Sequence, residues 1–224
     1  MFTTNALRNS LTRLGLFALV AFLASCVGYG AAATDGRSPF GFTVFNDAVY
    51  FSAFDAASGS ELWRTDGTEA GRVRVKDINP GPNGSTSGSL TVFNNALYFS
   101  ANDGASGFEL WRSDGTEAGT VRVKDINPGV NGSIPGSFIV FKDALYFSAN
   151  DGTSGFELWK SDGTEAGTVR VKDINPGPGG SSPFRFAVLT DALYFFADDG
   201  TNGFVQWRSD GTEAGTVRRA RQEH

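Results

Sequence analysis

Short apolar segments separated by polar, glycine-containing turns recur along the chain and predict β-strands. In the third copy of this pattern the apolar segments cover 138–141, 144–149 and 156–160. A fourth segment, 168–174, alternates valine with arginine and lysine and is followed by Asn-Pro-Gly. Segments of four to seven residues have the usual strand length, and no window carries a helical apolar period.

The tryptophans give the period of this pattern. They are spaced 48 residues apart, and the sequence around them repeats as well; they are Trp63, Trp111, Trp159 and Trp207. Four antiparallel strands in a period of 40 to 50 residues are typical of a β-propeller blade. The sequence therefore predicts an all-β, propeller-like repeat array of four blades with four strands each. The expected blades are 40–81, 88–129, 136–177 and 184–220, with a linker at 27–39 and a tail at 221–224.

The distribution of apolar residues predicts the order of strands within a blade. The first two segments are apolar on both faces, so neighbouring blades must cover them. The last segment alternates with charges that discourage edge pairing, which places it at the rim. The fourth copy departs from the pattern at its end, where Arg219 and Ala220 follow Val217 and Arg218. A tight four-blade ring, an incomplete array and a ring made by two copies all fit.

The N-terminus has the features of a secretory signal at 1–26. Arg8 and Arg13 precede an apolar run at 14–23, and no acidic residue occurs before Cys26. The run is short for a membrane span and is expected to form the signal helix. Leu-Ala-Ser before Cys26 resembles a bacterial lipobox, which implies lipidation of that cysteine.

The residue after the cysteine indicates the destination. Val27 stands where an aspartate would favour retention at the inner membrane, so an outer-membrane or cell-surface lipoprotein is expected. Ordinary secretion, with cleavage near the alanines at 31–33, is the alternative. In either case the protein acts outside the cytoplasm, and the lipid is its only expected membrane contact.

Composition narrows the function classes. The formal net charge is -5, which argues against nucleic acid as a partner. The only cysteine is Cys26, so an intrachain disulfide is impossible. The only histidine is His224, at the end of the sequence, which excludes a Ser-His-Asp triad or a histidine-rich zinc site within the fold.

A longer motif surrounds each tryptophan. The segments 109–116 (Glu-Leu-Trp-Arg-Ser-Asp-Gly-Thr) and 123–129 (Val-Lys-Asp-Ile-Asn-Pro-Gly) resemble the ELWxxDGT-repeat proteins of bacteria. The resemblance covers about 40–217 in four copies. It implies a propeller-like domain on secreted or surface proteins, and it transfers no reaction and no catalytic residue. The fourth copy departs from the motif at Val205 and Gln206.

The repeated aspartates are candidates for structural turns or for a metal site. Asp-Gly pairs after each tryptophan are expected to cap turns through backbone N–H groups; these aspartates are Asp66, Asp114, Asp162 and Asp210. The loop after the second strand and the connection after the fourth should share one face of a blade. Their oxygen atoms suit a Ca²⁺ ion, although no EF-hand pattern is present. The expected ligands are Asn102, Asp103 and Asp125 in one blade and Asn150, Asp151 and Asp173 in the next.

A carboxylate pair and the tryptophans are two further candidates for a functional role. The recurring pair Glu109 and Asp114 offers two carboxylates of the kind a glycosidase uses. Identical pairs in several blades argue for structure, because catalysis needs one asymmetric constellation. The tryptophans are expected to pack between blades, with a sugar-stacking surface as the alternative.

These observations predict a non-catalytic binding or scaffold module, lipid-tethered at the cell surface. Its expected partner is a protein or a carbohydrate, no cofactor is required beyond the calcium considered above, and an incomplete ring would allow a homo-oligomer. One alternative is an extracytoplasmic hydrolase or lyase that acts on polysaccharide. The other is a fragment of a longer repeat protein with no independent function.

Overall fold

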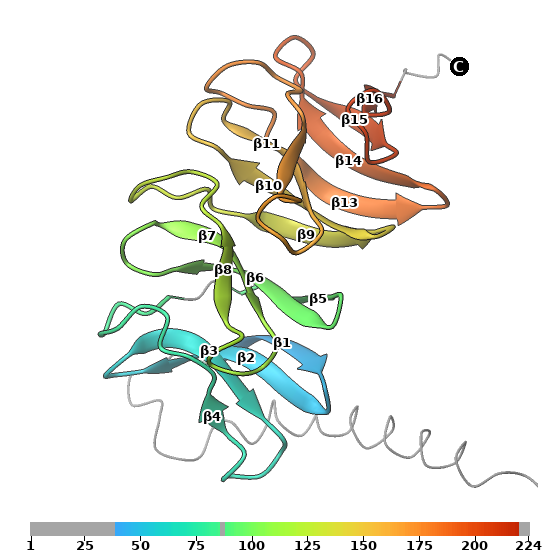
Figure 1. Ribbon diagram of the computed structural model, residues 1–224. Helices are drawn as coiled ribbons and strands as arrows, with labels where there is room; N and C mark the ends of the chain where they lie inside the picture. Colours follow the sequence, from blue (N-terminus) through green and yellow to red (C-terminus); the bar gives the residue numbers. More distant parts are fainter. Residues whose placement is uncertain (1–38, 86–87, 220–224) are drawn as a thin grey trace, which may run out of the picture.

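The fold is an array of four separate antiparallel sheets, each with four strands in sequence order (Figure 1). The computed structural model describes residues 39–85 and 88–219. Blade 1 contains β1 (Phe40–Phe45), β2 (Ala48–Asp55), β3 (Gly59–Thr65) and β4 (Val73–Arg74). Blade 2 contains β5 (Thr91–Phe93), β6 (Ala96–Asn102), β7 (Phe108–Ser113) and β8 (Val121–Lys124). Blade 3 contains β9 (Gly136–Phe141), β10 (Ala144–Asn150), β11 (Phe156–Ser161) and β12 (Val169–Lys172). Blade 4 contains β13 (Phe184–Leu189), β14 (Ala192–Asp198), β15 (Phe204–Ser209) and β16 (Val217–Arg218).

The predicted all-β architecture of propeller blades is confirmed, and local sequence explains each blade. In blade 2 the first two strands are joined by a two-residue turn in which Asn94 and Asn95 have φ of 45° and 54°. Positive φ at both central residues defines the hairpin turn that matches the twist of the strands, and asparagine tolerates it well. The turn fixes the register at Phe93 opposite Ala96, so the apolar side chains of the second strand point alternately to the two neighbouring blades.

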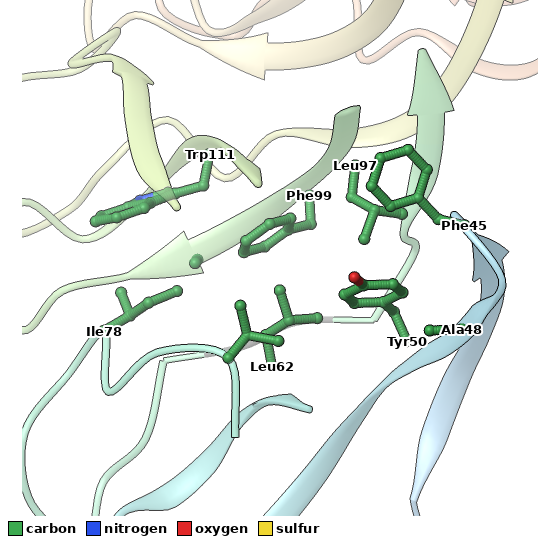
Figure 2. Close-up of a cluster of buried hydrophobic side chains, with 10 residues drawn as sticks. Phe45, Ala48, Tyr50, Leu62, Ile78, Leu97, Phe99 and Trp111 are labelled. Carbon is green, nitrogen blue, oxygen red and sulfur yellow. The ribbon is translucent and has the colours of Figure 1, made fainter. Parts of the chain in front are cut away.

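Hydrophobic contacts between successive blades hold the array together. Blade 1 contributes Tyr50 and Leu62 to the first cluster, and blade 2 contributes Phe99 and Trp111 (Figure 2). Corresponding clusters join blade 2 to blade 3 and blade 3 to blade 4. Each blade therefore has a forward face, which packs on the next blade, and a backward face, which carries the tryptophan and packs on the previous one.

Lysine side chains add a polar link across the same interfaces. Lys124 Nζ, from the last strand of blade 2, donates to the carbonyl oxygen of Thr168 in blade 3 at 2.8 Å. Lys76 makes the same bond to Thr120 one blade earlier, at 2.9 Å. The charged rim strand thus contributes to blade stacking as well as to protecting the sheet edge.

The four blades form an open arc. The hydrophobic clusters found among the described residues join consecutive blades, and none of them joins blade 4 to blade 1. Figure 1 shows these two blades at opposite ends of the stack. The described chain therefore has an open arrangement rather than a closed four-blade ring.

The inner strands are less covered than their sequence predicts. Val92 and Val188 of the first strands are 40% and 43% exposed, although both faces of these strands were expected to be buried. The expectation was wrong because the inner strands line the hollow of the arc, where an open array leaves side chains in solvent. The second strands meet the expectation, and Phe99 and Phe147 are fully buried.

The expected signal segment and Cys26 lie outside the described residues. Within 39–85 and 88–219, no helix is long and apolar enough to cross a bilayer.

Candidate functional site

In each Asp-Gly-Thr turn, the aspartate carboxylate accepts hydrogen bonds from the threonine of the same turn. Asp114 Oδ1 accepts from the backbone N–H of Thr116 at 2.8 Å and from its hydroxyl at 2.7 Å. The Thr116 hydroxyl in turn accepts from Gly119 N–H at 3.0 Å. These bonds lower the pKa of Asp114, with the Thr116 hydroxyl as the largest cause. The same bonds between the aspartate and the threonine recur at Asp66, Asp162 and Asp210.

The glycine of this turn allows a tyrosine of the preceding blade to approach the backbone closely. Gly163 has φ of +96°, and a Cβ there would collide with the hydroxyl of Tyr98 from blade 2. Only glycine combines that backbone conformation with such a close approach. The Asp-Gly-Thr motif is therefore a turn built to receive a neighbouring blade.

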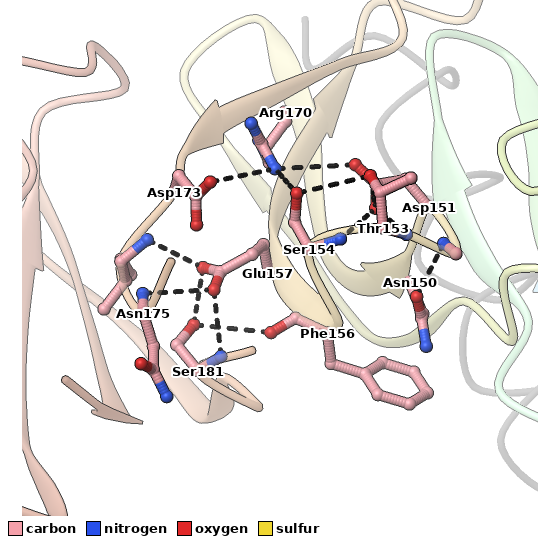
Figure 3. Close-up of polar contacts among 12 residues, drawn as sticks. Asn150, Asp151, Thr153, Ser154, Phe156, Glu157, Arg170, Asp173, Asn175 and Ser181 are labelled. Atoms are coloured by element: carbon pink, nitrogen blue, oxygen red, sulfur yellow. Dashed lines mark hydrogen bonds and ion pairs between the residues drawn. The ribbon is translucent and has the colours of Figure 1, made fainter. Parts of the chain in front are cut away.

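The glutamate of the motif is a buried anchor for the chain that leads to the next blade (Figure 3). Glu157 is fully buried, and its Oε2 accepts from Ile174 N–H at 3.0 Å and from the Ser181 hydroxyl at 2.6 Å. Its Oε1 accepts from Asn175 N–H at 3.2 Å and Ser181 N–H at 2.9 Å. Burial raises the pKa of Glu157, while the bonds from Ser181, Ile174 and Asn175 lower it in part.

This anchor was not found from the sequence. Glu61 and Glu109 are likewise fully buried and accept the corresponding N–H groups at Ile78 and Ile126. The available signal was that the glutamate is present in three copies and is replaced by Val205 in the fourth.

The two carboxylates of the motif do not form a catalytic pair. Glu109 lies near the start of β7, and Asp114 follows its end, five residues away. An extended strand places them roughly 16 Å apart. Glycosidases need their carboxyl groups within about 10 Å, so this pair does not fit that chemistry.

The loops proposed to bind calcium do meet, around an arginine. Arg170 Nη1 lies 3.4 Å from Asp151 Oδ2 and 3.4 Å from Asp173 Oδ2, and it also binds the hydroxyl of Ser154 (Figure 3). Asn150 Oδ1 accepts from Gly152 N–H at 2.7 Å within its own loop.

The preceding blade has the same arrangement. Arg122 lies 3.6 Å from Asp103 Oδ2 and 3.4 Å from Asp125 Oδ2, and Asn102 caps its loop. The guanidinium occupies the position expected for the metal and would repel one. In the described part of the chain, no three acidic, histidine or cysteine side chains are grouped to hold an ion. We therefore do not propose calcium at these loops.

Three of the four tryptophans lie in the interfaces between blades. Trp111, Trp159 and Trp207 are 6–7% exposed, whereas Trp63 is half-buried on the backward face of blade 1. A row of exposed tryptophans for sugar stacking is therefore absent from the described blades.

A small hollow lies between blades 2 and 3. Its volume is about 300 Å³, and it is lined by Gly88, Ser89, Ser100, Phe108, Ile134, Pro135 and Gly136. None of these lining residues is titratable, so the hollow offers no acid or base for catalysis.

The forward face of blade 4 differs from the other forward faces. Leu158, buried in the cluster between blades 3 and 4, corresponds to Gln206, and Val171 corresponds to Arg219. Arg219 Nη1 donates to Gln206 Oε1 at 3.0 Å, and Arg219 N–H donates to the Gln206 carbonyl at 2.9 Å. Two apolar positions that pack on a following blade have thus become a hydrogen-bonded polar pair.

Comparisons with known proteins support the fold and no closer relationship. No protein-family model matches the chain, and no curated protein matches it. A puromycin hydrolase crystal structure is similar, with a TM-score of 0.51 and 15% identity over 84% of this chain. A prolyl endopeptidase has a TM-score of 0.50 and 14% identity over 78% of it. The computationally designed Ika4 protein has a TM-score of 0.43 and 14% identity, with 80% of this chain and 98% of Ika4 covered.

The chain spans only 30% of the puromycin hydrolase and 25% of the prolyl endopeptidase. At these identities the likeness shows the fold alone. The chain is therefore a β-propeller repeat protein in its architecture.

Proposed function

We propose that this protein is a non-catalytic binding or scaffold module of the ELWxxDGT-repeat type, tethered by a lipid at Cys26 outside the cytoplasm. The observation that carries the proposal is that the carboxylates of the repeated motif are already bound within the fold. Glu109 holds the connection to the next blade, and Asp114 caps its own turn. Carboxylates that are hydrogen-bonded within the fold in several blades stabilise the blades and are not available as reacting groups.

The catalytic alternative has a direct test. A polysaccharide hydrolase or lyase activity that disappears when one carboxylate is replaced, as in Asp114→Asn, would refute the proposal. The expected result is no turnover of carboxylated or neutral polysaccharides by the full chain.

The tether is tested by metabolic labelling with a radiolabelled fatty acid in a bacterial host. The wild-type chain should incorporate label and sediment with membranes, and Cys26→Ser should do neither. Ser25→Ala keeps a small residue before the cysteine and should still be labelled, so it serves as the matched control. Unchanged membrane fractionation and labelling of Cys26→Ser would remove the lipid tether from the proposal.

A further inference from the structure

The forward face of blade 4, which points away from blade 3, has its own set of side chains. Side chains alternate between the faces of a sheet, and Phe184 pairs with Phe196, which pairs with Gln206. Phe184, Phe196, Gln206 and Arg219 therefore form one row across the four strands. We call this row, together with Phe204 and Arg185, the terminal face.

Three aromatic rings gather on the terminal face, and two of them are half-buried while the third is exposed. The ring of Phe184 lies 5.9 Å from that of Phe196 and 5.3 Å from that of Phe204, which is 56% exposed. The positions of Phe184 and Phe196 are Gly136 and Ser148 in blade 3. Relative to blade 3, blade 4 therefore carries two additional rings on a face that packs on no other described blade, although blade 1 also has a phenylalanine, Phe40, at the first of these positions.

Cations flank these rings. The Arg185 guanidinium stands over the Phe184 ring at 5.6 Å from its centroid, and Arg219 closes the other end of the row. Three strand spacings separate the two ends, roughly 14 Å. In the described part of the chain neither arginine is paired with a carboxylate, whereas Arg122 and Arg170 each bind two aspartates. Two arginines at the ends of an aromatic row, without an internal acid, favour an anionic ligand by local charge complementarity.

The shape of the face restricts the kind of ligand. Backbone hydrogen bonds are used within a sheet, so its face offers only side chains, and peptide recognition by strand addition needs an edge instead. A sugar ring has a flat apolar side that fits aromatic rings, and hydroxyl groups that fit the Gln206 amide. A guanidinium binds a carboxylate through two parallel hydrogen bonds.

We propose that the terminal face binds a polysaccharide whose sugars carry carboxylates. The sugar rings lie on Phe184 and Phe196, and the carboxylates bind Arg185 and Arg219. The proposal deepens the binding function proposed above and rests on it.

Titration calorimetry of the full chain with an oligogalacturonate tests the proposal. The wild type should bind, and raising the salt concentration should weaken binding. Phe196→Ser, which restores the residue of blades 2 and 3, and Arg219→Gln should each weaken it about tenfold or more. Arg64→Gln removes an exposed arginine of blade 1 and should leave the affinity unchanged. Unaltered thermal midpoints would show that the variants are folded.

The comparison ligands separate this proposal from its competitors. A neutral maltooligosaccharide should not bind measurably, and poly-L-glutamate should bind at least tenfold more weakly than the oligogalacturonate. Equal binding of poly-L-glutamate, or binding only to phosphatidylglycerol vesicles, would overturn the assignment to a sugar. Oligogalacturonate binding that neither variant weakens would refute this site while leaving the proposed binding function in place.

Discussion

The buried glutamate of the motif allows a sharp test of how the blades are connected. Replacing Glu157 with glutamine keeps the size of the side chain and turns one of its acceptor oxygens into an NH₂ donor. The carboxylate accepts four hydrogen bonds, so the new donor must face other donors.

The structure sets the expected magnitude. If the NH₂ replaces Oε2, the Ser181 hydroxyl can turn and accept from it, and only the Ile174 N–H loses its acceptor. In the other orientation, the backbone N–H groups of Asn175 and Ser181 both lose theirs. The first orientation is cheaper, and one buried N–H without a partner costs about 1–3 kcal/mol. Glu157→Gln should lower the free energy of unfolding by that amount.

Urea unfolding at pH 7, followed by tryptophan fluorescence, measures this loss. Glu165→Gln is the matched control, because this exposed side chain of the same repeat should change stability by no more than about 0.5 kcal/mol. A loss for Glu157→Gln no larger than that of the control would refute the anchoring role. Loosening of the connection should also increase hydrogen exchange at Ile174 and Ser181.

Three other predictions concern the core, the turns and the terminal blade. Trp111→Ala should lower the free energy of unfolding by roughly 3–5 kcal/mol in the same urea assay. Trp63→Ala, at the half-buried tryptophan on the backward face of blade 1, should lower it by clearly less. Equal losses would contradict the interface role of Trp111. The pKa of Asp114 is lowered in the folded state. The ionised carboxylate therefore contributes to folding stability above its unfolded pKa of about 3.9, and this contribution is lost as the pH falls through the folded pKa. Asp114→Asn should thus destabilise at neutral pH, and its difference from wild type should shrink as the pH is lowered. A difference that stays constant through the acid range would contradict this prediction. Gln206→Leu combined with Arg219→Val makes these two forward positions of blade 4 apolar, as in blade 3. Sedimentation of the double variant should then show association that rises with concentration. A double variant that stays monomeric at all concentrations would contradict the idea that the polar pair prevents packing on this face.

The sequence was sufficient for the blades because their structure is local. Strands, turns and their order depend on residues a few positions apart, such as Asn94 and Asn95 in a hairpin turn. The placement of Trp111 between blades also followed, since a regularly spaced large aromatic residue needs cover on its own sheet face.

The site features that escaped prediction depend on partners farther along the chain. The acceptors of Glu157 bind donors 17 to 24 residues away, and no local pattern indicates which connection passes over a buried carboxylate. The proposed calcium loops were correctly brought together, but the guanidinium of Arg170, on β12 just before Asp173, reaches across to Asp151, 19 residues earlier in the sequence, and fills the space between them. Openness of the array depends on the angle between blades, which side-chain packing sets.

The backward and forward faces of the blades differ in how their interface residues change along the array. Backward contacts are kept to the end, since Trp207 is buried against blade 3. Two forward contacts are lost in the fourth repeat, where Gln206 and Arg219 stand at positions that are buried and apolar in blade 3, and Val205 takes the place of the anchor glutamate. A polar pair at positions that pack on a following blade in the other repeats makes this face compatible with solvent. The cluster of Phe184, Phe196 and Phe204 on this face does not follow from compatibility with solvent, and the proposed ligand would account for it.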